Sequence, residues 1–326
     1  MPTVQTLKSA NNFQTEFHQR CGGLNDPHVR ALAWLLFAPD LLATHAPQWR
    51  GKIATLPAYL LDGVDEWLKN IDDQPDVLHR YLNLQPFARL GRYAEKLMAV
   101  FLEQKNVLFA HGVQVRAGKN STIGEFDFLL RLHGQLVHWE FATKFYLLES
   151  NGAGDDADYF VGPNLADTLG AKMHKILDRQ LLLSAQPAAK IHLPEPVSCA
   201  QALVKGWLFY PDLESPQASV FGTSPAHCRG FWCTFSEVMS LSAERYAILP
   251  RLQWLAPAKL PAQQTIDKQV LQSCLAEYFI ENTMPVLVAQ LEINGDTGVE
   301  VSRGFIVPDD WRSRAGQRVK LTHPSA

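Results

Sequence analysis

The sequence lacks any cysteine pattern that could build a disulfide framework or a zinc site. Its 326 residues contain five cysteines, which are widely scattered and form no Cys-x-x-Cys pair and no Cys/His ligand spacing. This odd number fits reduced thiols in a cytosolic protein best. We therefore expect no structural zinc.

Long hydrophobic runs and a leader-like N-terminus are also absent. The longest apolar stretch, residues 31–38, ends at Pro39 and is far shorter than the roughly 20 residues that span a bilayer. The N-terminal residues do not join a charged start to an apolar run, so we do not expect a secretory signal. These absences predict a cytoplasmic protein without membrane contact.

The chain has no excess of positive charge. Its 30 Lys and Arg residues stand against 33 Asp and Glu residues, which gives a net charge of −3. No global basic field exists to hold nucleic acid, so any such binding must come from a local patch. The 47% hydrophobic content suffices for a full core, in one large domain or two modest ones.

The N-terminal part of the chain is expected to be helical. Between residues 25 and 83 the apolar side chains recur at helical spacing, and Asp26 followed by Pro27 is typical of a capped helix start. A further amphipathic helix is predicted over residues 87–104. Glu95 lies on a face of this helix that neighbours the apolar one.

The periodicity of the apolar residues then changes from about 3.6 to about 2, which indicates strands. The order of helix, three strands, helix and strand predicts a mixed α/β sheet with helices on its faces. The predicted elements after the amphipathic helix are strands 107–117, 123–132 and 135–148, an exposed Gly- and Asp-rich excursion 151–164, a helix 165–184 that starts near Asn164 or Asp167, and a strand 204–211.

The signals are weaker in the C-terminal third of the chain. We expect β structure over residues 246–257, a helix over 267–282, and a strand pair joined around Asn294 and Gly295. The tail after Trp311 is polar and is predicted to be loose.

The second and third predicted strands carry the residues with chemical potential. A two-residue loop at His133 and Gly134 would make an antiparallel hairpin in which Asp127 pairs with Glu140. Directly opposed residues have Cβ atoms about 4.5–5.5 Å apart. Two carboxylates at this spacing must share a proton, attract cations or bind a metal, and oxygen ligands suit Mg²⁺ or Mn²⁺.

Strand alternation predicts an apolar face and an acid-rich polar face for this hairpin. Lys144 shares the polar face and could neutralise developing charge there. The apolar set is Phe126, Phe128, Leu130, Trp139, Phe141 and Phe145, and the polar set is Glu125, Asp127, His138, Glu140 and Lys144.

Four blocks of the sequence together resemble a bacterial family of unknown function that is assigned to the PD-(D/E)XK phosphodiesterase superfamily. These blocks are LGRYAEKL, GEFDFLL, HWEFATKFYL and FVGPNLADTLGAKMHKILDRQL. The resemblance runs through most of the chain. It implies a mixed-sheet, restriction-endonuclease-like core over residues 86–210, flanked by helices. A helical region (1–85) would precede this core, and an α+β region (211–326) would pack on it.

The resemblance also implies a metal-dependent cut of a phosphodiester. By position, Asp127 and Glu140 would be the metal ligands, Lys144 would orient the attacking water, and Glu95 matches the first-helix acid of many members. Gln180 resembles the helix-borne glutamine of some nuclease branches.

The chain departs from the superfamily motif at two positions. Phe126 stands where the motif has proline, and Lys144 follows Glu140 by four residues instead of two, with Ala142 at the expected lysine position. Four residues of regular strand separate the Cα atoms of Glu140 and Lys144 by about 13 Å unless a bulge shortens the path.

Each candidate also has a purely structural interpretation. Asp127, Glu140 and Glu95 could be solvated surface acids, Lys144 could form an ion pair with Glu125 or Glu149, and His138 could simply be hydrogen-bonded. A basic stripe on one predicted helix could track phosphates or be a solvated face, and the Gly162–Asn164 turn could attract an anion or only start that helix. The stripe is Lys172, Lys175 and Arg179.

These observations favour a Mg²⁺- or Mn²⁺-dependent phosphodiesterase, a nuclease acting on DNA or RNA. Asp127 and Glu140, with Glu95, are the expected metal ligands, and Lys144 is the expected charge-stabilising residue. Two alternatives remain open. The chain could be a catalytically inactive nuclease fold that binds or scaffolds a partner, or it could hydrolyse a small phosphodiester.

Overall fold

The computed structural model describes residues 12–83, 89–118, 121–149, 157–211 and 222–322. The predictions for the extreme N-terminus, for the first residues of the 87–104 helix and for much of the 151–164 excursion lie outside these residues. The helices are α1 (Phe13–Cys21), α2 (Pro27–Phe37), α3 (Val64–Asp73), α4 (Asp76–Leu82), α5 (Leu90–Gln104), α6 (Leu169–Asp178), α7 (Lys268–Glu281) and α8 (Trp311–Thr322).

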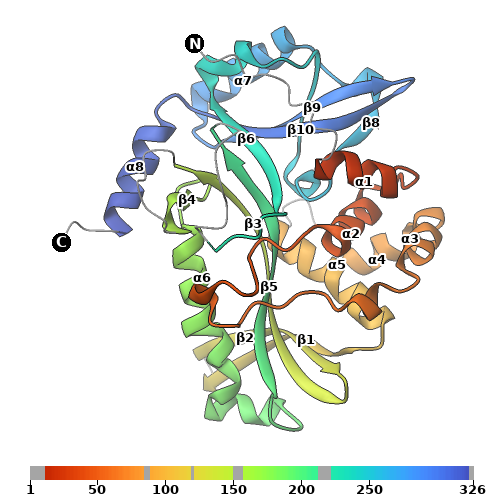
Figure 1. Ribbon diagram of the computed structural model, residues 1–326, viewed down its shortest axis with the longest axis vertical. Helices are drawn as coiled ribbons and strands as arrows, with labels where there is room; N and C mark the ends of the chain where they lie inside the picture. The colour runs from red at the N-terminus through yellow and green to blue at the C-terminus, as the bar shows by residue number, and fades with distance from the viewer. Residues whose placement is uncertain (1–11, 84–88, 119–120, 150–156, 212–221, 323–326) are drawn as a thin grey trace.

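The strands form one ten-stranded mixed sheet, so the chain is an α/β protein (Figure 1). Its main path runs β1-β2-β3-β5-β6-β10-β9-β7, with β4 added to β3 and β8 added to β10. The strands are β1 (Leu108–Gly118), β2 (Ser121–Leu132), β3 (Gln135–Leu148), β4 (Phe160–Val161), β5 (Cys199–Tyr210), β6 (Cys228–Thr234), β7 (Arg245–Ile248), β8 (Lys259–Pro261), β9 (Val286–Asn294) and β10 (Thr297–Val307).

The centre of the sheet is parallel and its two ends are antiparallel. β3 pairs parallel with β5, β5 with β6, and β6 with β10, whereas β1-β2-β3 and β10-β9-β7 are antiparallel. Parallel neighbours need long crossover connections, and α6 lies in the one between β3 and β5. The strands of the predicted core and of the predicted C-terminal region therefore share one sheet.

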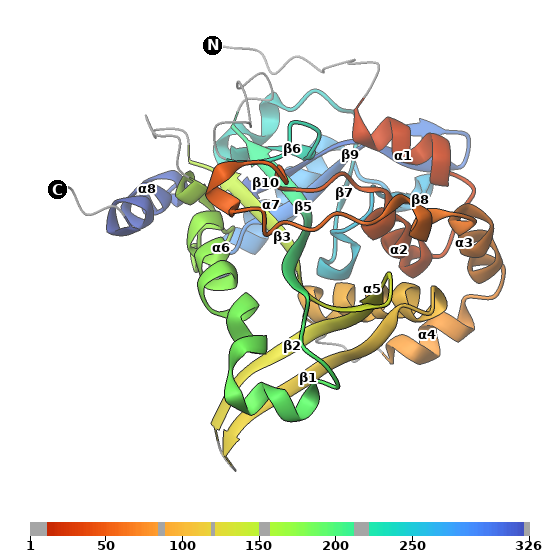
Figure 2. The ribbon, with the colours of Figure 1, turned by 60° about the horizontal axis from the view of Figure 1, so that its bottom comes forward.

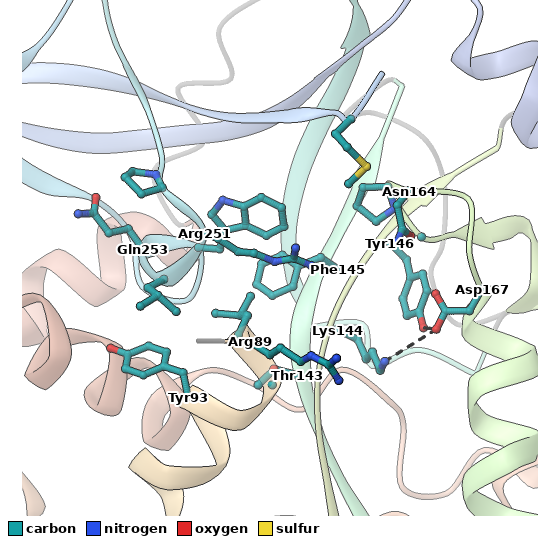
Figure 3. A pocket seen from close by; sticks show the side chains of 18 of the residues that line it. Arg89, Tyr93, Thr143, Lys144, Phe145, Tyr146, Asn164, Asp167, Arg251 and Gln253 are labelled. Carbon is teal, nitrogen blue, oxygen red and sulfur yellow. Dashed lines mark hydrogen bonds and ion pairs between the residues drawn. The ribbon is translucent and has the colours of Figure 1, made fainter. Parts of the chain in front are cut away.

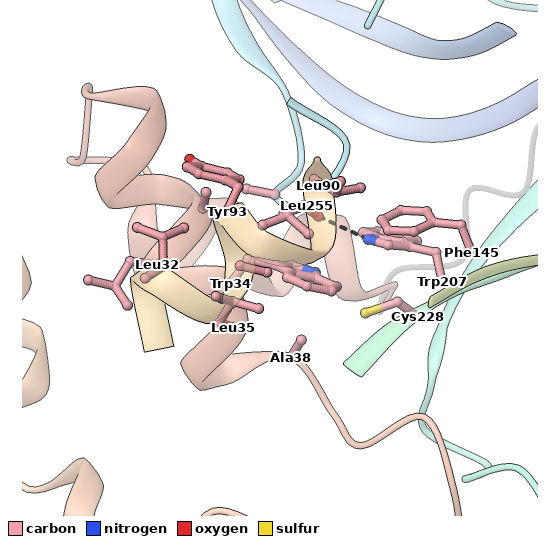
Figure 4. Packing of buried hydrophobic residues seen from close by; sticks show 14 of the residues in the cluster. Leu32, Trp34, Leu35, Ala38, Leu90, Tyr93, Phe145, Trp207, Cys228 and Leu255 are labelled. Atoms are coloured by element: carbon pink, nitrogen blue, oxygen red, sulfur yellow. Dashed lines mark hydrogen bonds between the residues drawn. The ribbon is translucent and has the colours of Figure 1, made fainter. Parts of the chain in front are cut away.

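Different helices cover the two faces of the sheet. α2 and α5 pack on one face in the largest apolar cluster, while α6 and residues 41–53 cover the other face (Figure 1). In the large cluster the Trp34 ring on α2 stacks on the Trp207 ring of β5, with centroids 6.3 Å apart (Figure 4). The Trp207 indole N–H also donates to the Leu255 carbonyl at 2.9 Å. Segments far apart in the sequence, α2 and the chain around Leu255, thus pack against β5.

The structure confirms the main predicted elements. Asp26 caps α2, with Pro27 as its first residue, and β3 has the predicted bounds. The predicted helix over 165–184 is wrong in length. α6 begins after the Thr168 cap and ends at Asp178, and the chain continues as the 3₁₀ helix η4 (Gln180–Ala185).

Three features of the C-terminal part differ from the predictions. The β structure expected over residues 246–257 ends with β7 at Ile248, and the chain continues as the 3₁₀ helix η8 (Arg251–Gln253). The tail expected to be loose forms α8, whose Trp311 is fully buried, and β6 was not predicted at all. The helix predicted over 267–282 is confirmed as α7, and the strand pair around Asn294 as β9 and β10. Among the described residues, no helix combines the length and the apolar character needed to cross a lipid bilayer.

Candidate metal centre

The hairpin of β2 and β3 has the predicted register. Its turn residues His133 and Gly134 both have positive φ, at 49° and 77°, which is the geometry of a tight two-residue turn. Pairing runs from Leu132 with Gln135 up to Phe128 with Trp139. The hydrogen-bonded ladder ends there, one pair before Asp127 and Glu140.

Asp127 lies where β2 separates from β3. Its Oδ2 atom accepts a hydrogen bond from the Phe141 backbone N–H at 2.9 Å, so its carboxylate bridges the opening between the strands. On the β1 side Asp127 faces Gly112, which has a φ of +63°, and neither residue belongs to the β1–β2 pairing. The pairs on either side, His111 with Phe128 and Val113 with Phe126, keep the same register, so the backbone is distorted here without an inserted residue.

This irregularity breaks the predicted alternation of side chains. Phe128 packs in the large cluster near α5, but Phe126 packs in a different cluster, and its ring lies edge-on to His138 with centroids 4.8 Å apart. The prediction that Phe126 and Phe128 share one face is therefore wrong. Because the backbone turns over at Asp127, acids on both sides of the sheet can reach this residue.

Three acids meet on the α5 side of the sheet. Glu95 on α5, Glu125 on β2 and Asp127 each offer a carboxylate oxygen, and these oxygens lie within 4.8 Å of one another. Arg92 lies beside this group, because its Nη1 atom is 3.4 Å from Glu125 Oε1. The sequence prediction included Glu95 and Asp127 but gave Glu125 no role as a ligand.

Glu140 approaches Asp127 from the other side of the sheet. Its side chain is buried, and Oε1 lies 3.0 Å from His138 Nε2. The Gln180 side-chain amide, at the start of η4, donates to Oε2, and Lys172 on α6 donates to the Gln180 oxygen at 3.2 Å. A chain of polar contacts thus links Glu140 to a cation.

Burial raises the pKa of Asp127, of Glu95 and of Glu140. The pKa of Asp127 rises to about 7 through burial and then through the charge of Glu140, and that of Glu95 rises to about 7 through burial and then through Asp127. Burial also raises the pKa of Glu140 to about 7, although the nearby Lys172 opposes the rise. Three crowded acids therefore hold protons near neutral pH, where a bound cation would displace them.

His138 is neutral at physiological pH, since burial lowers its pKa to about 4. The neutral ring can donate one N–H, and Nε2 faces Glu140. We therefore interpret His138 as a residue that orients Glu140.

The structure does not bring Lys144 to these acids. β3 pairs with β5 in unbroken register from Val137 to Leu147, so no bulge shortens the path from Glu140 to Lys144. The Lys144 ammonium pairs with Asp167 at 3.9 Å, whereas Glu125 has Arg92 as its partner. Lys172 is the lysine whose charge acts most strongly on Glu140.

The predicted basic stripe is only partly formed. Lys172 is half-buried and Lys175 is exposed on α6, but Arg179 lies beyond the end of the helix with non-helical backbone angles. Gly162–Asn164 does not start α6 directly, because Thr168 is the N-cap. The contact between Lys172 and Gln180 was not predicted, since it depends on the chain leaving the α-helix at Arg179.

A sequence model of the family described as "Domain of unknown function (DUF1853)" matches residues 30–307, which are most of the chain. No curated protein and no solved structure matches the chain.

Proposed function

The chain belongs to the DUF1853 family, a family of unknown function, and from this premise we propose that it is a divalent-metal-dependent phosphodiesterase acting on DNA or RNA. We extend the proposal to the fold. The succession of α5, β1, β2, β3, α6 and β5 has the order of helix, three strands, helix and strand that the sequence predicted. It supports a restriction-endonuclease-like core within the larger sheet.

The observation that carries the proposal is the crowding of acids around Asp127. Among the described residues, Glu95, Asp127 and Glu140 form no ion pair with a lysine or an arginine. Buried like charges without such partners destabilise a fold, and a bound divalent cation removes that cost. Carboxylate oxygens are the ligands that Mg²⁺ and Mn²⁺ prefer.

The residues of the site divide into ligands and supporting groups. Asp127 and Glu140 would hold the cation, with Glu95 as a further ligand. When bound, Mg²⁺ or Mn²⁺ supplies Lewis-acid chemistry for in-line attack of water on a phosphodiester. The Phe141 N–H orients Asp127, while His138 and Gln180 orient Glu140. Lys172, which contacts Glu140 through Gln180, would stabilise the negative charge that develops on the phosphate.

A binding or scaffolding function without catalysis is the second candidate. It is favoured by Lys144, which pairs with Asp167 and is absent from the carboxylates, and by Ala142 at the position where the motif has lysine. Under this alternative the acids would still bind a cation, but no bond would be cut.

A cleavage assay with a matched variant separates the two candidates. Wild type, Asp127→Asn and Asp178→Asn are incubated with single- and double-stranded DNA, RNA and bis(4-nitrophenyl) phosphate, in Mg²⁺, Mn²⁺ or EDTA. We expect cleavage that needs the metal and falls about 100-fold or more in Asp127→Asn. Asp178→Asn should match wild type, because its pair with Arg50 is exposed. No cleavage by wild type on any substrate would favour the scaffolding function.

A further inference from the structure

A large pocket lies between the start of α5 and β3, and three basic side chains are among the residues that line it. Its volume is about 940 Å³, within the range of small-molecule sites. Four segments form most of its wall: the start of α5, residues 143–146 of β3, residues 162–167, and the turn that contains η8 (Arg251–Gln253). Pro27, His28 and Met284 complete the lining.

Three cations from three elements enter this pocket. Figure 3 shows Arg89, just before α5, Lys144 on β3, and Arg251 in η8 extending into the same space. Neither Arg89 nor Arg251 forms an ion pair with a carboxylate of the described residues. Asp167 is the one acid among the described lining residues, and its pair with Lys144 is long, at 3.9 Å.

The backbone adds donors at the same place. Among the described residues no side chain caps α5, which begins after Arg89, and the N–H groups of its first turn carry partial positive charge toward the pocket wall formed by Leu90 and Gly91. The Thr143 hydroxyl is buried and has no hydrogen-bond partner among the described residues. Positive charges that converge repel one another unless an anion lies between them, and the nearby donors could bind that anion.

The pocket also offers aromatic surface. The half-buried Trp254 ring contacts the Phe145 ring with centroids 5.6 Å apart, and both residues line the pocket. A ligand that combines a phosphate with a flat ring would use both the charges and the aromatic side chains.

The pocket is connected to the acids by two elements. Along α5, Glu95 lies one turn beyond Gly91, about 6 Å along the helix axis. Along β3, Glu140 precedes Lys144 by about 13 Å of strand. A chain of nucleotides with one phosphate at the acids would place a neighbouring unit in the pocket.

We propose that this pocket binds a phosphorylated nucleotide, through the phosphate on Arg89, Arg251 and Lys144 and the base or sugar on the aromatic wall. This inference rests on the proposed function and names its substrate subsite. It also gives Lys144 the role of a substrate-binding residue. The nucleotide could be part of a nucleic acid strand or a free mononucleotide, and the experiment below separates these sources.

Binding is measured without catalysis, so that it is independent of cleavage. A fluorescein-labelled single-stranded oligodeoxynucleotide is titrated with Asp127→Asn protein in EDTA, and fluorescence anisotropy is recorded. Arg89→Gln and Arg251→Gln are each added to this background. Arg80→Gln, which removes an exposed arginine on α4, is the matched control. Circular dichroism checks that each variant is folded.

We expect each pocket variant to weaken binding by about tenfold or more, because each removes a charged contact to phosphate. The salt dependence should also become shallower, by about 0.7 in slope per lost phosphate contact. Arg80→Gln should bind like its parent. Thymidine monophosphate should compete, and thymidine should not. If thymidine monophosphate competes at concentrations near those at which the oligonucleotide binds, the ligand is a free nucleotide. If it competes only at far higher concentrations, the ligand is a nucleic acid strand.

Unchanged affinity in both pocket variants, or no binding of either probe by the parent, would overturn the inference. The two proposals can fail separately. If wild type cleaves and the arginine variants bind as their parent does, the phosphodiesterase function is supported and nucleotide binding in the pocket is excluded. If binding depends on the arginines but no cleavage occurs, nucleotide binding in the pocket is supported and the phosphodiesterase function is excluded.

Discussion

Glu140 is held by two side chains, and the second of them connects it to a lysine. His138 approaches from the same strand, and Gln180 from the turn after α6. Lys172 follows through Gln180, and burial together with the neighbouring Lys175 lowers its pKa. The group is compact, so each member is open to a single-substitution test.

Lys172→Met should lower the maximal cleavage rate by about 100-fold, since it removes a charge beside the reacting phosphate. Lys144→Met should instead raise KM and leave the maximal rate close to wild type, because its ammonium faces the pocket and Asp167. Steady-state kinetics on one oligonucleotide compares the two variants. Lys69→Met, which removes an exposed lysine on α3, is the control. The assignment fails if Lys144→Met has the larger effect on the maximal rate.

The raised pKa of Asp127 makes stability depend on pH in a defined direction. A carboxyl whose pKa rises from about 4 to about 7 on folding binds more protons in the native state between those values, so the free energy of unfolding falls as pH increases through this window. Asp127→Asn removes this loss. In EDTA, the free energy of unfolding of the variant should rise relative to that of wild type by on the order of 1–3 kcal/mol between pH 5 and pH 8.

Urea unfolding at both pH values measures this gain. Adding Mg²⁺ at pH 8 should stabilise wild type, by about 2.7 kcal/mol at a hundredfold excess over Kd, and should leave Asp127→Asn unchanged. Asp178→Asn serves as the control and should follow wild type throughout. Equal Mg²⁺ responses in wild type and Asp127→Asn would exclude the metal site.

At the scale of the element, the interruption of β1 and β2 places Asp127 between the two sets of acids. Gly112→Ala forces a side chain into left-handed backbone at this interruption, which costs about 1–2 kcal/mol. Gly134→Ala in the hairpin turn carries a similar cost, because Gly134 also has positive φ, and an added Cβ would meet no atom within 4 Å.

The two variants should therefore lose similar stability but differ in their response to metal. We expect Gly112→Ala to show a weaker Mg²⁺-induced increase in Tm, while Gly134→Ala keeps the wild-type increase. Differential scanning fluorimetry with and without Mg²⁺ gives the Tm of each variant and the increase in Tm that Mg²⁺ causes. If the two variants respond equally to Mg²⁺, the strand interruption does not position Asp127.

Much of the hairpin could be predicted from local signals. The alternation in β3 and the His133–Gly134 turn fix its register, and this register brings Asp127 near Glu140. The reversal of Phe126 was not predicted, because it depends on how the segment after α6 packs against β1 and β2 (Figure 2). An isolated glycine at position 112 inside an apolar run was the available sequence signal.

The end of α6 shows where local signals were insufficient. The apolar spacing continues through Leu181 and Leu183, so it predicts a longer helix, but these side chains are buried after the backbone changes to 3₁₀ geometry. Packing against β2 and β5 favours that change over intrinsic helix propensity. Gln180 reaches Glu140 only because of it.

At the scale of the whole molecule, the sheet makes the predicted core dependent on the rest of the chain. β5 pairs with β6, and Trp207 packs on Trp34 and donates to Leu255. A fragment of residues 86–210 would expose these surfaces and should not fold. Near-ultraviolet circular dichroism and urea titration compare the fragment with the full chain. A cooperative unfolding transition in the fragment would contradict this expectation.

The position of β10 in the sheet has a consequence for biosynthesis. β10 is the last strand in the chain, yet it lies between β6 and β9. During translation, β6 leaves the ribosome long before its partner, and at about 5–20 residues per second the delay is on the order of 4–15 seconds. An unpaired apolar edge exposed for that time attracts other chains. The yield of native protein in the cell should therefore depend on chaperones that cover the nascent sheet until residues 304–307 have been made and can pair with β6.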